Sequence, residues 1–539
     1  MHQPMMLMKA RSLTDHLERN TRTVMCLTML SRFSGLLREG VLSRLFGTDA
    51  MLGSFYFAFI IPNLFRRLFG EGALAASFLP EYQKHVRDDP EVASAVAGLT
   101  TGGLLLGLSA IVIVAELVLF LIAALPGTPG PALWLTMIML PYAPLVCCVA
   151  LLGAMLQVHG RFGPTAAAPI ILNVCLAGAA AVSWWLLKPT TDGERLRVTA
   201  VMAGAVLLAG VLQAGWSWLA LRKLTTLRLD RSGMDGVRTV LRKMGPMLLG
   251  LGVLQINALF DGLIASWPNL SSSDMIFGVA YPLDVHAMSV LTFAQRLYQF
   301  PLGVFGVAVA TAIYPLLAAR ASDSDGFIDM VRRGLRLVLF IGLPASAGLF
   351  LVRTPLTAVL LQGGNFGTDD TARVAFVLAG YATSIWAYCI VQVLTRAFYA
   401  KGDLSTPVRL AVSMVAMNLA LNLVLIFTPL KEAGLAWSTA FCGAVQALVL
   451  WSLLHRSHGG LLQRNVLDSA LRSVLATAVM AGAVIVVLTV LGPATTWSAS
   501  LTQLLCAVGA GGAVYVGCAA AAGMPELRWA LGRKLNPAD

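Results

Sequence analysis

Charged side chains are scarce in this sequence. They make up 12% of its 539 residues, about half of the roughly 25% that is usual in soluble proteins. Together with a mean hydropathy of +0.76, this scarcity excludes an ordinary soluble globular protein. The net charge of +12 comes from Lys and Arg gathered between apolar runs, a distribution that membrane topology requires and nucleic-acid binding does not.

The patterns that accompany catalysis and tightly bound metals are also missing. The sequence contains no HExxH, no P-loop and no Ser–His–Asp arrangement. Its eight cysteines lie in apolar runs without metal-ligand spacing, where Cys serves as a small buried hydrophobe. We therefore expect neither an enzyme nor a resident cofactor.

Long apolar runs are what the sequence has instead. A membrane-spanning helix takes about 20 such residues, and we count fourteen candidate spans, so we predict an all-α polytopic membrane protein. Most Lys and Arg outside the spans fall in the two termini and the even-numbered loops, which places both termini in the cytoplasm. The predicted spans are 23–46, 52–82, 96–126, 132–158, 163–187, 197–221, 245–267, 287–318, 334–361, 372–400, 405–428, 432–454, 466–492 and 499–523.

Two pairs of segments recur at nearly the same offset. "IIPNLFRRLFG" and "QFPLGVFGVAV" place their prolines 239 residues apart, and "GRFGPTAAAPIILN" and "GDLSTPVRLAVSMVAMN" begin 242 residues apart. Transporters often consist of such repeats with the substrate between them. We predict two pseudo-repeated six-helix lobes around a central cationic cavity, followed by two further helices. The expected divisions are an N-lobe at 1–222, a basic amphipathic linker on the inner membrane surface at 223–244, a C-lobe at 245–456, and helices 13 and 14 with a cytoplasmic tail at 465–539.

Four arginines lie well inside predicted spans: Arg32, Arg38, Arg66 and Arg296. Each would cost roughly 2.5–3.5 kcal/mol at the bilayer centre. The nearby acids are only Glu39 and Glu71, so ion pairs alone would leave excess positive charge. Internal salt bridges with snorkelling remain one explanation, but the imbalance favours a water-filled site for an anion. Arg suits phosphate and carboxylate, which its planar fork binds through two hydrogen bonds.

The segments that carry these residues resemble the MurJ (MviN) lipid II flippases, members of the multidrug/oligosaccharidyl-lipid/polysaccharide exporter superfamily. The resemblance covers nearly the whole chain in order, with fourteen spans. The matching segments are "SRFSGLLREGVLSRLFG", "FAFIIPNLFRRLFGEGALAASFLPEY", "AQRLYQFPLGVFGVAVATAIYP" and "AFYAKGDLSTPVRLAV".

The resemblance implies a multi-pass protein of the bacterial cytoplasmic (inner) membrane that works as a monomer. It implies alternating access that carries lipid II, an undecaprenyl-pyrophosphate-linked disaccharide-peptide, from the inner to the outer leaflet. The implied partners are lipid II and membrane lipids, not nucleic acid. By the same resemblance, the substrate-binding residues are Arg32, Arg38, Arg66, Arg296, Glu39, Asn63 and Glu71.

The sequence departs from the family pattern at three places. Gly53 stands where many members carry an aspartate, and Asp49 is the nearest alternative acid. Gln295 precedes Arg296 where some members have an acid. The connection 268–287 is longer than usual. It is either a lid on the outer side or a tolerated surface insertion.

Two Asn/Asp pairs four residues apart suggest a sodium site. Some family members use their seventh, eleventh and twelfth helices for this ion, and Asn and Asp oxygens suit hard cations. Hydrogen bonding between helices explains the same pairs equally well. The sequence leaves open whether membrane potential, sodium or protons drive the cycle. The residues concerned are Asn257, Asp261, Asn418, Asn422 and Ser438.

Other functions remain open on the residues alone. A flippase for another polyprenyl-pyrophosphate-linked saccharide would need the same arginines. A cation-coupled exporter should line its cavity with acids and aromatics. An enzyme acting on polyprenyl pyrophosphate would need a base or metal-binding acids, for which Glu39 and Glu71 are the candidates. A scaffold for cell-wall assembly would tolerate Arg→Lys at all four arginines.

Overall fold

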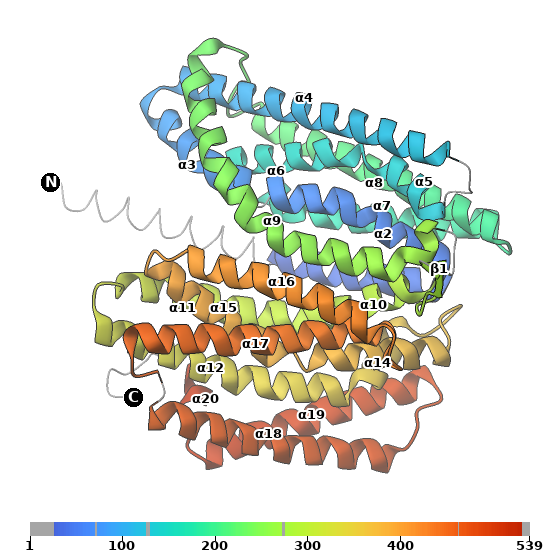
Figure 1. Cartoon of the computed structure of the whole chain (residues 1–539), viewed down its shortest axis with the longest axis vertical. Helices are drawn as coiled ribbons and strands as arrows, with labels where there is room; N and C mark the ends of the chain where they lie inside the picture. The colour runs from blue at the N-terminus through green and yellow to red at the C-terminus, as the bar shows by residue number, and fades with distance from the viewer. Residues whose placement is uncertain are drawn as a thin grey trace. The chain divides into compact units, whose positions relative to one another are not determined.

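The computed structural model describes residues 26–70, 73–125, 130–271, 275–276, 278–461 and 463–530, and nearly all of them are helical (Figure 1). In this part of the chain, the strands are β1 (Met275–Ile276) and β2 (Val279–Ala280), which form one short antiparallel hairpin. The prediction of an all-α protein is confirmed.

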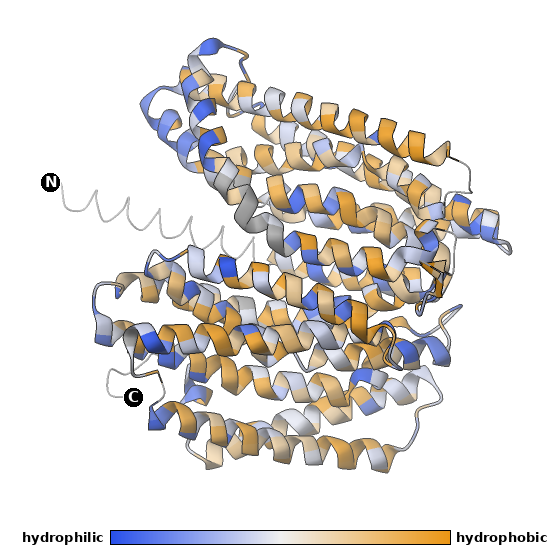
Figure 2. Cartoon of the chain, in the orientation of Figure 1, coloured by the Kyte–Doolittle hydropathy of each residue, from blue (hydrophilic) through white to orange (hydrophobic). Residues whose placement is uncertain are grey.

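Eleven helical segments among the described residues are long and apolar enough to cross a membrane. Figure 2 shows apolar residues along the helices and hydrophilic residues near many of their ends. The eleven coincide with eleven of the predicted spans. The other three predictions fall on the helix at 26–46, on α2 to α3 and on α9, so the count of fourteen is not confirmed. The eleven are Pro90–Ala123, Pro131–Val158, Gly163–Leu187, Asp192–Leu221, Ala287–Ala319, Ser324–Leu351, Thr368–Ala400, Ser405–Leu425, Ala433–Ser457, Arg464–Leu491 and Trp497–Ala521.

The chain divides into two compact units, 1–281 and 282–539. In unit 1, α7 and α6 both pack on α8, while α2 packs on α5 and α9. The lobes predicted from the internal repeat, 1–222 and 245–456, differ from these two units, which are defined by contacts between residues. The division into repeated lobes stays a prediction. After the helix at 26–46, the elements of unit 1 are α2 (Ala50–Phe65), η1 (Arg66–Gly70), α3 (Ala73–Asp88), α4 (Pro90–Ala123), α5 (Pro131–Met139), α6 (Tyr142–Val158), α7 (Gly163–Leu187), α8 (Asp192–Leu221), η2 (Arg231–Gly233), α9 (Met234–Ser271), β1 and β2.

Unit 2 is held together around α12, which packs on α15 and α18. Glu526 of α20 is buried and accepts hydrogen bonds from Arg336 Nε and Ser469 Oγ, each at 2.6 Å. Three helices of this unit therefore meet at one carboxylate. The elements of unit 2 are α10 (Ala287–Pro301), η3 (Leu302–Gly306), α11 (Val307–Ala319), α12 (Ser324–Leu351), α13 (Arg353–Leu361), α14 (Thr368–Ala382), α15 (Ile385–Ala400), α16 (Ser405–Leu425), α17 (Ala433–His458), α18 (Arg464–Leu491), α19 (Trp497–Ala521) and α20 (Pro525–Ala530).

The repeated sequence segments share an unusual backbone feature. Pro62 lies near the end of α2, which continues into the π-helical turn η1, and Pro301 ends α10, which continues into the π-helical turn η3. Proline has no N–H to donate within a helix, and π-helical turns occur often at functional sites. Arg66 begins the first of these turns.

The connection after α9 is anchored at both ends. Tyr281 donates a hydrogen bond to the carbonyl of Ile264 at 2.6 Å in unit 1. In unit 2, Asp284 accepts one from Arg373 at 2.8 Å, and Arg373 also pairs with Glu432. Partial burial opposes ionisation of Asp284, but the hydrogen bond and charge of Arg373 hold its pKa below the ordinary value.

The basic linker is packed against the protein along much of its length. The N–H of Arg228 donates to the carbonyl of Ser94 in α4 at 3.1 Å. Leu224 and Leu227 pack against the buried cluster that includes Val240. The segment 223–244 therefore comprises a stretch that lies along α4, the short helix η2 and the first turns of α9.

Gly98 of α4 is essential to that packing, because a Cβ there would lie 2.1 Å from the carbonyl oxygen of Arg228. Gly98→Ala is expected to lower the free energy of unfolding by about 1–3 kcal/mol. Gly103→Ala is the matched control, since a Cβ at Gly103 would meet nothing within 4 Å and alanine favours a helix by about 1 kcal/mol. Thermal unfolding of both variants in detergent measures the difference, and equal melting temperatures would contradict this packing.

Candidate functional site

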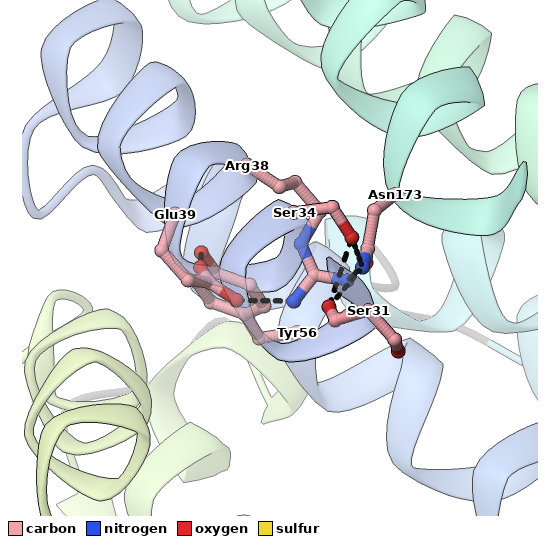
Figure 3. A network of polar contacts seen from close by, with 6 residues as sticks. All are labelled: Ser31, Ser34, Arg38, Glu39, Tyr56 and Asn173. Atoms are coloured by element: carbon pink, nitrogen blue, oxygen red, sulfur yellow. Dashed lines mark hydrogen bonds and ion pairs between the residues drawn. The ribbon is translucent and has the colours of Figure 1, made fainter. Parts of the chain in front are cut away.

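A buried ion pair connects three helices of unit 1 (Figure 3). Arg38 of the helix at 26–46 pairs with Glu39, and its Nη1 donates to Asn173 Oδ1 of α7 at 2.9 Å. Glu39 also accepts from the hydroxyl of Tyr56 in α2 at 2.6 Å. Arg38 is 8% exposed and Glu39 is 2% exposed. The salt-bridge explanation therefore holds for Arg38 in this conformation.

Asn173 is oriented by the same first helix. Its Nδ2 donates to Ser34 Oγ at 2.9 Å and to the Ser31 carbonyl at 3.4 Å, which turns Oδ1 toward Arg38. Two of the five N–H donors of Arg38 thus have protein acceptors, whereas its buried Nε has none among the described residues. Asn173 was not predicted from the sequence, although a single amide inside the apolar span "PIILNVCLAG" was a usable signal.

Removing the amide of Asn173 should weaken the network. Asn173→Ala leaves Arg38 Nη1 without its acceptor, and we expect a loss of about 1–3 kcal/mol in the free energy of unfolding. Ser34→Ala is the control, because it removes a donor-acceptor group but no contact to Arg38. Thermal unfolding of both variants tests whether Asn173→Ala lowers the free energy of unfolding more than Ser34→Ala does. An equal loss of unfolding free energy in the two variants would contradict this network.

Arg66 and Arg67 are oriented by amide side chains. Arg66 donates through Nε and Nη2 to Asn63 Oδ1, at 3.0 and 2.8 Å. Arg67 donates through Nη1 to Gln255 Oε1 of α9 at 3.0 Å. These amides hold the two guanidinium groups in place, and the role of Arg66 in binding an anion stays a prediction.

Arg32 differs from the other arginines of unit 1. Its side chain is exposed, and no hydrogen bond or ion pair links it to another described residue. The apolar side chains around it in the sequence are exposed too, including Met29 at 68% and Phe33 at 59%. Arg32 is therefore an exposed cation on an apolar helix, and its anion-binding role stays a prediction.

Arg296 lies in α10 of unit 2 and is half-buried. Gln295 donates to the hydroxyl of Tyr381 at 3.0 Å, and the ring of Tyr381 stacks on Tyr298 with centroids 4.5 Å apart. Gln295, which stands where some family members have an acid, therefore helps to hold the stacked rings of Tyr381 and Tyr298 in place. Glu71, also predicted as a site residue, lies outside the described residues.

Asp49 is engaged in local structure. It caps α2 by accepting from the N–H of Met51 at 2.7 Å, and it pairs with Arg195 of α8 at 2.6 Å. The hypothesis that it substitutes for the acid missing at Gly53 stays a prediction.

The residues proposed for sodium form hydrogen bonds within each unit. In unit 2, Asn418 donates to Ser438 at 3.2 Å, Asn422 donates to Asn418 Oδ1 at 3.0 Å, and Ser438 donates to Asn422. In unit 1, Asn257 donates to Asp261 at 3.4 Å. The donor types suit sodium, but the oxygens of Asn418 and Asn422 already accept hydrogen bonds, so the sodium site stays a prediction.

Comparison with known proteins gives a consistent result. A family model described as lipid II flippase MurJ matches residues 42–504. A probable lipid II flippase MurJ of Vibrio cholerae serotype O1 is 30% identical over 503 residues, covering 89% of this chain and 91% of that protein. The lipid II flippase MurJ of Burkholderia cenocepacia is 32% identical over 450 residues, covering 80% and 82%.

Solved structures show the same fold. The structure described as lipid II flippase MurJ in an inward closed conformation has a TM-score of 0.74 at 21% identity, covering 95% of this chain and 99% of that one. An inward-facing multidrug resistance MATE family transporter of the MOP superfamily has a TM-score of 0.60 at 16% identity, covering 81% and 98%.

Proposed function

Because this chain belongs to the lipid II flippase MurJ family, we propose that it moves lipid II from the inner to the outer leaflet of the bacterial cytoplasmic membrane. It works as a transporter by alternating access and makes or breaks no covalent bond in its substrate. We further propose that it acts as a monomer with both termini in the cytoplasm.

The observation that carries this proposal is the state of Arg32. An exposed arginine in an apolar helix, with no partner among the described residues, is costly in lipid. A pyrophosphate offers the anionic oxygens that a guanidinium binds best. Arg66, whose guanidinium is oriented by Asn63, is proposed as a second cation for the head group in unit 1. Arg296 is proposed as a further cation from unit 2.

The Arg38–Glu39 pair gives the site a way to release its substrate. Glu39 neutralises Arg38 in this conformation, so Arg38 attracts an anion weakly. When the pair opens, Arg38 regains its full charge, and its donors become available for the pyrophosphate. Glu39 then competes with the head group for Arg38 and favours release on the outer side.

Transport by the purified protein tests the substrate. Proteoliposomes would contain either lipid II or a polyprenyl pyrophosphate that bears a different saccharide. We expect lipid II to reach the opposite leaflet and the other lipid to remain where it was. Movement of the second lipid alone would support the alternative flippase, and movement of neither would contradict transport.

A further inference from the structure

A single acidic residue, Glu116, lies within the apolar part of α4. Between Leu104 and Ala123 the sequence is LLLGLSAIVIVAELVLFLIA, with no other charged residue. These 20 residues extend about 30 Å at 1.5 Å per residue, which matches the thickness of the hydrocarbon core. Glu116 lies about 18 Å from one end and about 10 Å from the other. Its short side chain therefore cannot reach either membrane surface.

Glu116 shares a helix face with residues that pack inside unit 1. Val112, Ala115 and Leu119 contact an apolar cluster that contains Leu140 and Ala143. Residue 116 is four after Val112 and three before Leu119, so it lies on the same stripe. In agreement, its Oε1 is buried and has no hydrogen-bond partner among the described residues.

No cation on the elements packed against α4 neutralises this carboxyl. In the described part of the chain, Glu116 forms no ion pair or hydrogen bond. α5 has no titratable side chain, and on α6 Tyr142 donates to Gln213 and Cys147 to the Phe65 carbonyl, while Cys148 packs in another cluster. α9 and η2 contact α4 around Val96, and the cluster that includes Val240 and Met244 of α9 reaches Leu105 of α4, about 16 Å along the helix from Glu116.

The remaining charged groups on these elements have partners elsewhere or lie in the polar segments near Val96. On η1, Arg66 is bonded to Asn63 and Arg67 to Gln255. On α9, Asp261 is bonded to Asn257. The others on α3, η2 and α9 are Glu81, Lys84, His85, Arg87, Asp88, Arg231, Asp235, Arg238, Arg242 and Lys243.

A bare carboxylate at this position is excluded by its free-energy cost in the membrane. An acidic side chain that is charged at the centre of a membrane helix costs roughly 2.5–3.5 kcal/mol, and no counter-charge reduces that cost here. Metal cations need several oxygen ligands, whereas Glu116 offers two. No group of three or more metal-binding side chains occurs among the residues that the structure describes.

We propose that Glu116 is a proton-binding site. In this conformation it holds the proton as a neutral carboxylic acid, and it becomes a carboxylate when water reaches the contact between α4 and α6. The exchange needs only a proton from water. This inference does not depend on which lipid the protein moves, and it identifies a residue through which protons can couple to a conformational change.

A lipid-soluble carbodiimide tests the protonation state directly. The carboxylic acid oxygen adds to the carbodiimide carbon, its proton passes to a carbodiimide nitrogen, and the adduct rearranges to a stable N-acylurea. The full-length protein in phospholipid vesicles would be treated with dicyclohexylcarbodiimide near neutral pH, where an ordinary exposed glutamate is almost wholly ionised. The modified peptides would then be mapped by mass spectrometry.

We expect modification of Glu116, falling as the pH rises, and none of Glu39 or Glu526, which each pair with an arginine. Infrared spectra should show a protonated carboxyl band that Glu116→Gln removes and Glu116→Asp retains. An unmodified Glu116 together with an unchanged infrared band in Glu116→Gln would overturn the proposal. A wild type that is modified at Glu116 but moves no lipid II would count against the proposed function alone.

Discussion

Replacing Glu39 by alanine is expected to lower the free energy of unfolding by about 3–5 kcal/mol, the usual cost of leaving one partner of a buried ion pair alone. Arg38 would keep its contact with Asn173 but would lose the carboxylate that neutralises it. The hydroxyl of Tyr56 would lose its hydrogen bond to Glu39 as well. Thermal unfolding in detergent, with expression matched to wild type, measures the loss.

A double variant separates the contribution of the Arg38–Glu39 pair to stability from its contribution to transport. Arg38→Met combined with Glu39→Leu replaces both charges by apolar groups, which is often neutral or stabilising. We expect nearly normal unfolding and little lipid II transport. A double variant as unstable as Glu39→Ala would contradict the assignment of the stability loss to an unpaired charge.

Replacing Arg32 by alanine is expected to weaken lipid II binding and to leave stability unchanged. A hydrogen bond to a charged group contributes about 1.5–3 kcal/mol, which corresponds to a loss of affinity of about 10- to 150-fold. Since Arg32 contacts no other described residue through hydrogen bonds or ion pairs, the change in unfolding free energy should stay within about 0.5 kcal/mol.

Arg44→Ala is the matched control for Arg32→Ala. Arg44 is also exposed on the helix at 26–46, but it lies twelve residues further along, near the predicted outer end. Lipid II binding by native mass spectrometry would compare both variants with wild type. Equal affinities for Arg32→Ala and wild type would show that this exposed cation does not bind the head group.

The sequence was informative about which residues are costly and less so about their partners. Arg38 and Glu39 are adjacent in the chain, but adjacent side chains on a helix do not face each other, so their pairing was not evident from the sequence. The contact of Arg38 with Asn173 joins residues 135 positions apart, and hydropathy cannot predict such a contact. The same limitation applies to Arg67 on η1 and Gln255 on α9.

Two omissions had signals that sequence reasoning did not use. Glu116 is the lone acid in an apolar span, and an isolated charge inside a membrane helix suggests a functional site. The place of Asp49 just before a helix is typical of a capping residue, and its carboxylate caps α2. Most span positions followed from length and hydropathy, but the predicted span 334–361 joined the end of α12 (Ser324–Leu351) to α13 (Arg353–Leu361), because both are apolar.

Outer-leaflet lipid II in a strain depleted of its own flippase tests the central claim most directly. Wild type, Arg32→Ala and Arg66→Ala would be compared at matched membrane levels. The proposed arginine site predicts that wild type restores outer-leaflet lipid II and that both variants fail. Equal restoration by all three would contradict it, because the arginines would then be dispensable for moving an anionic head group.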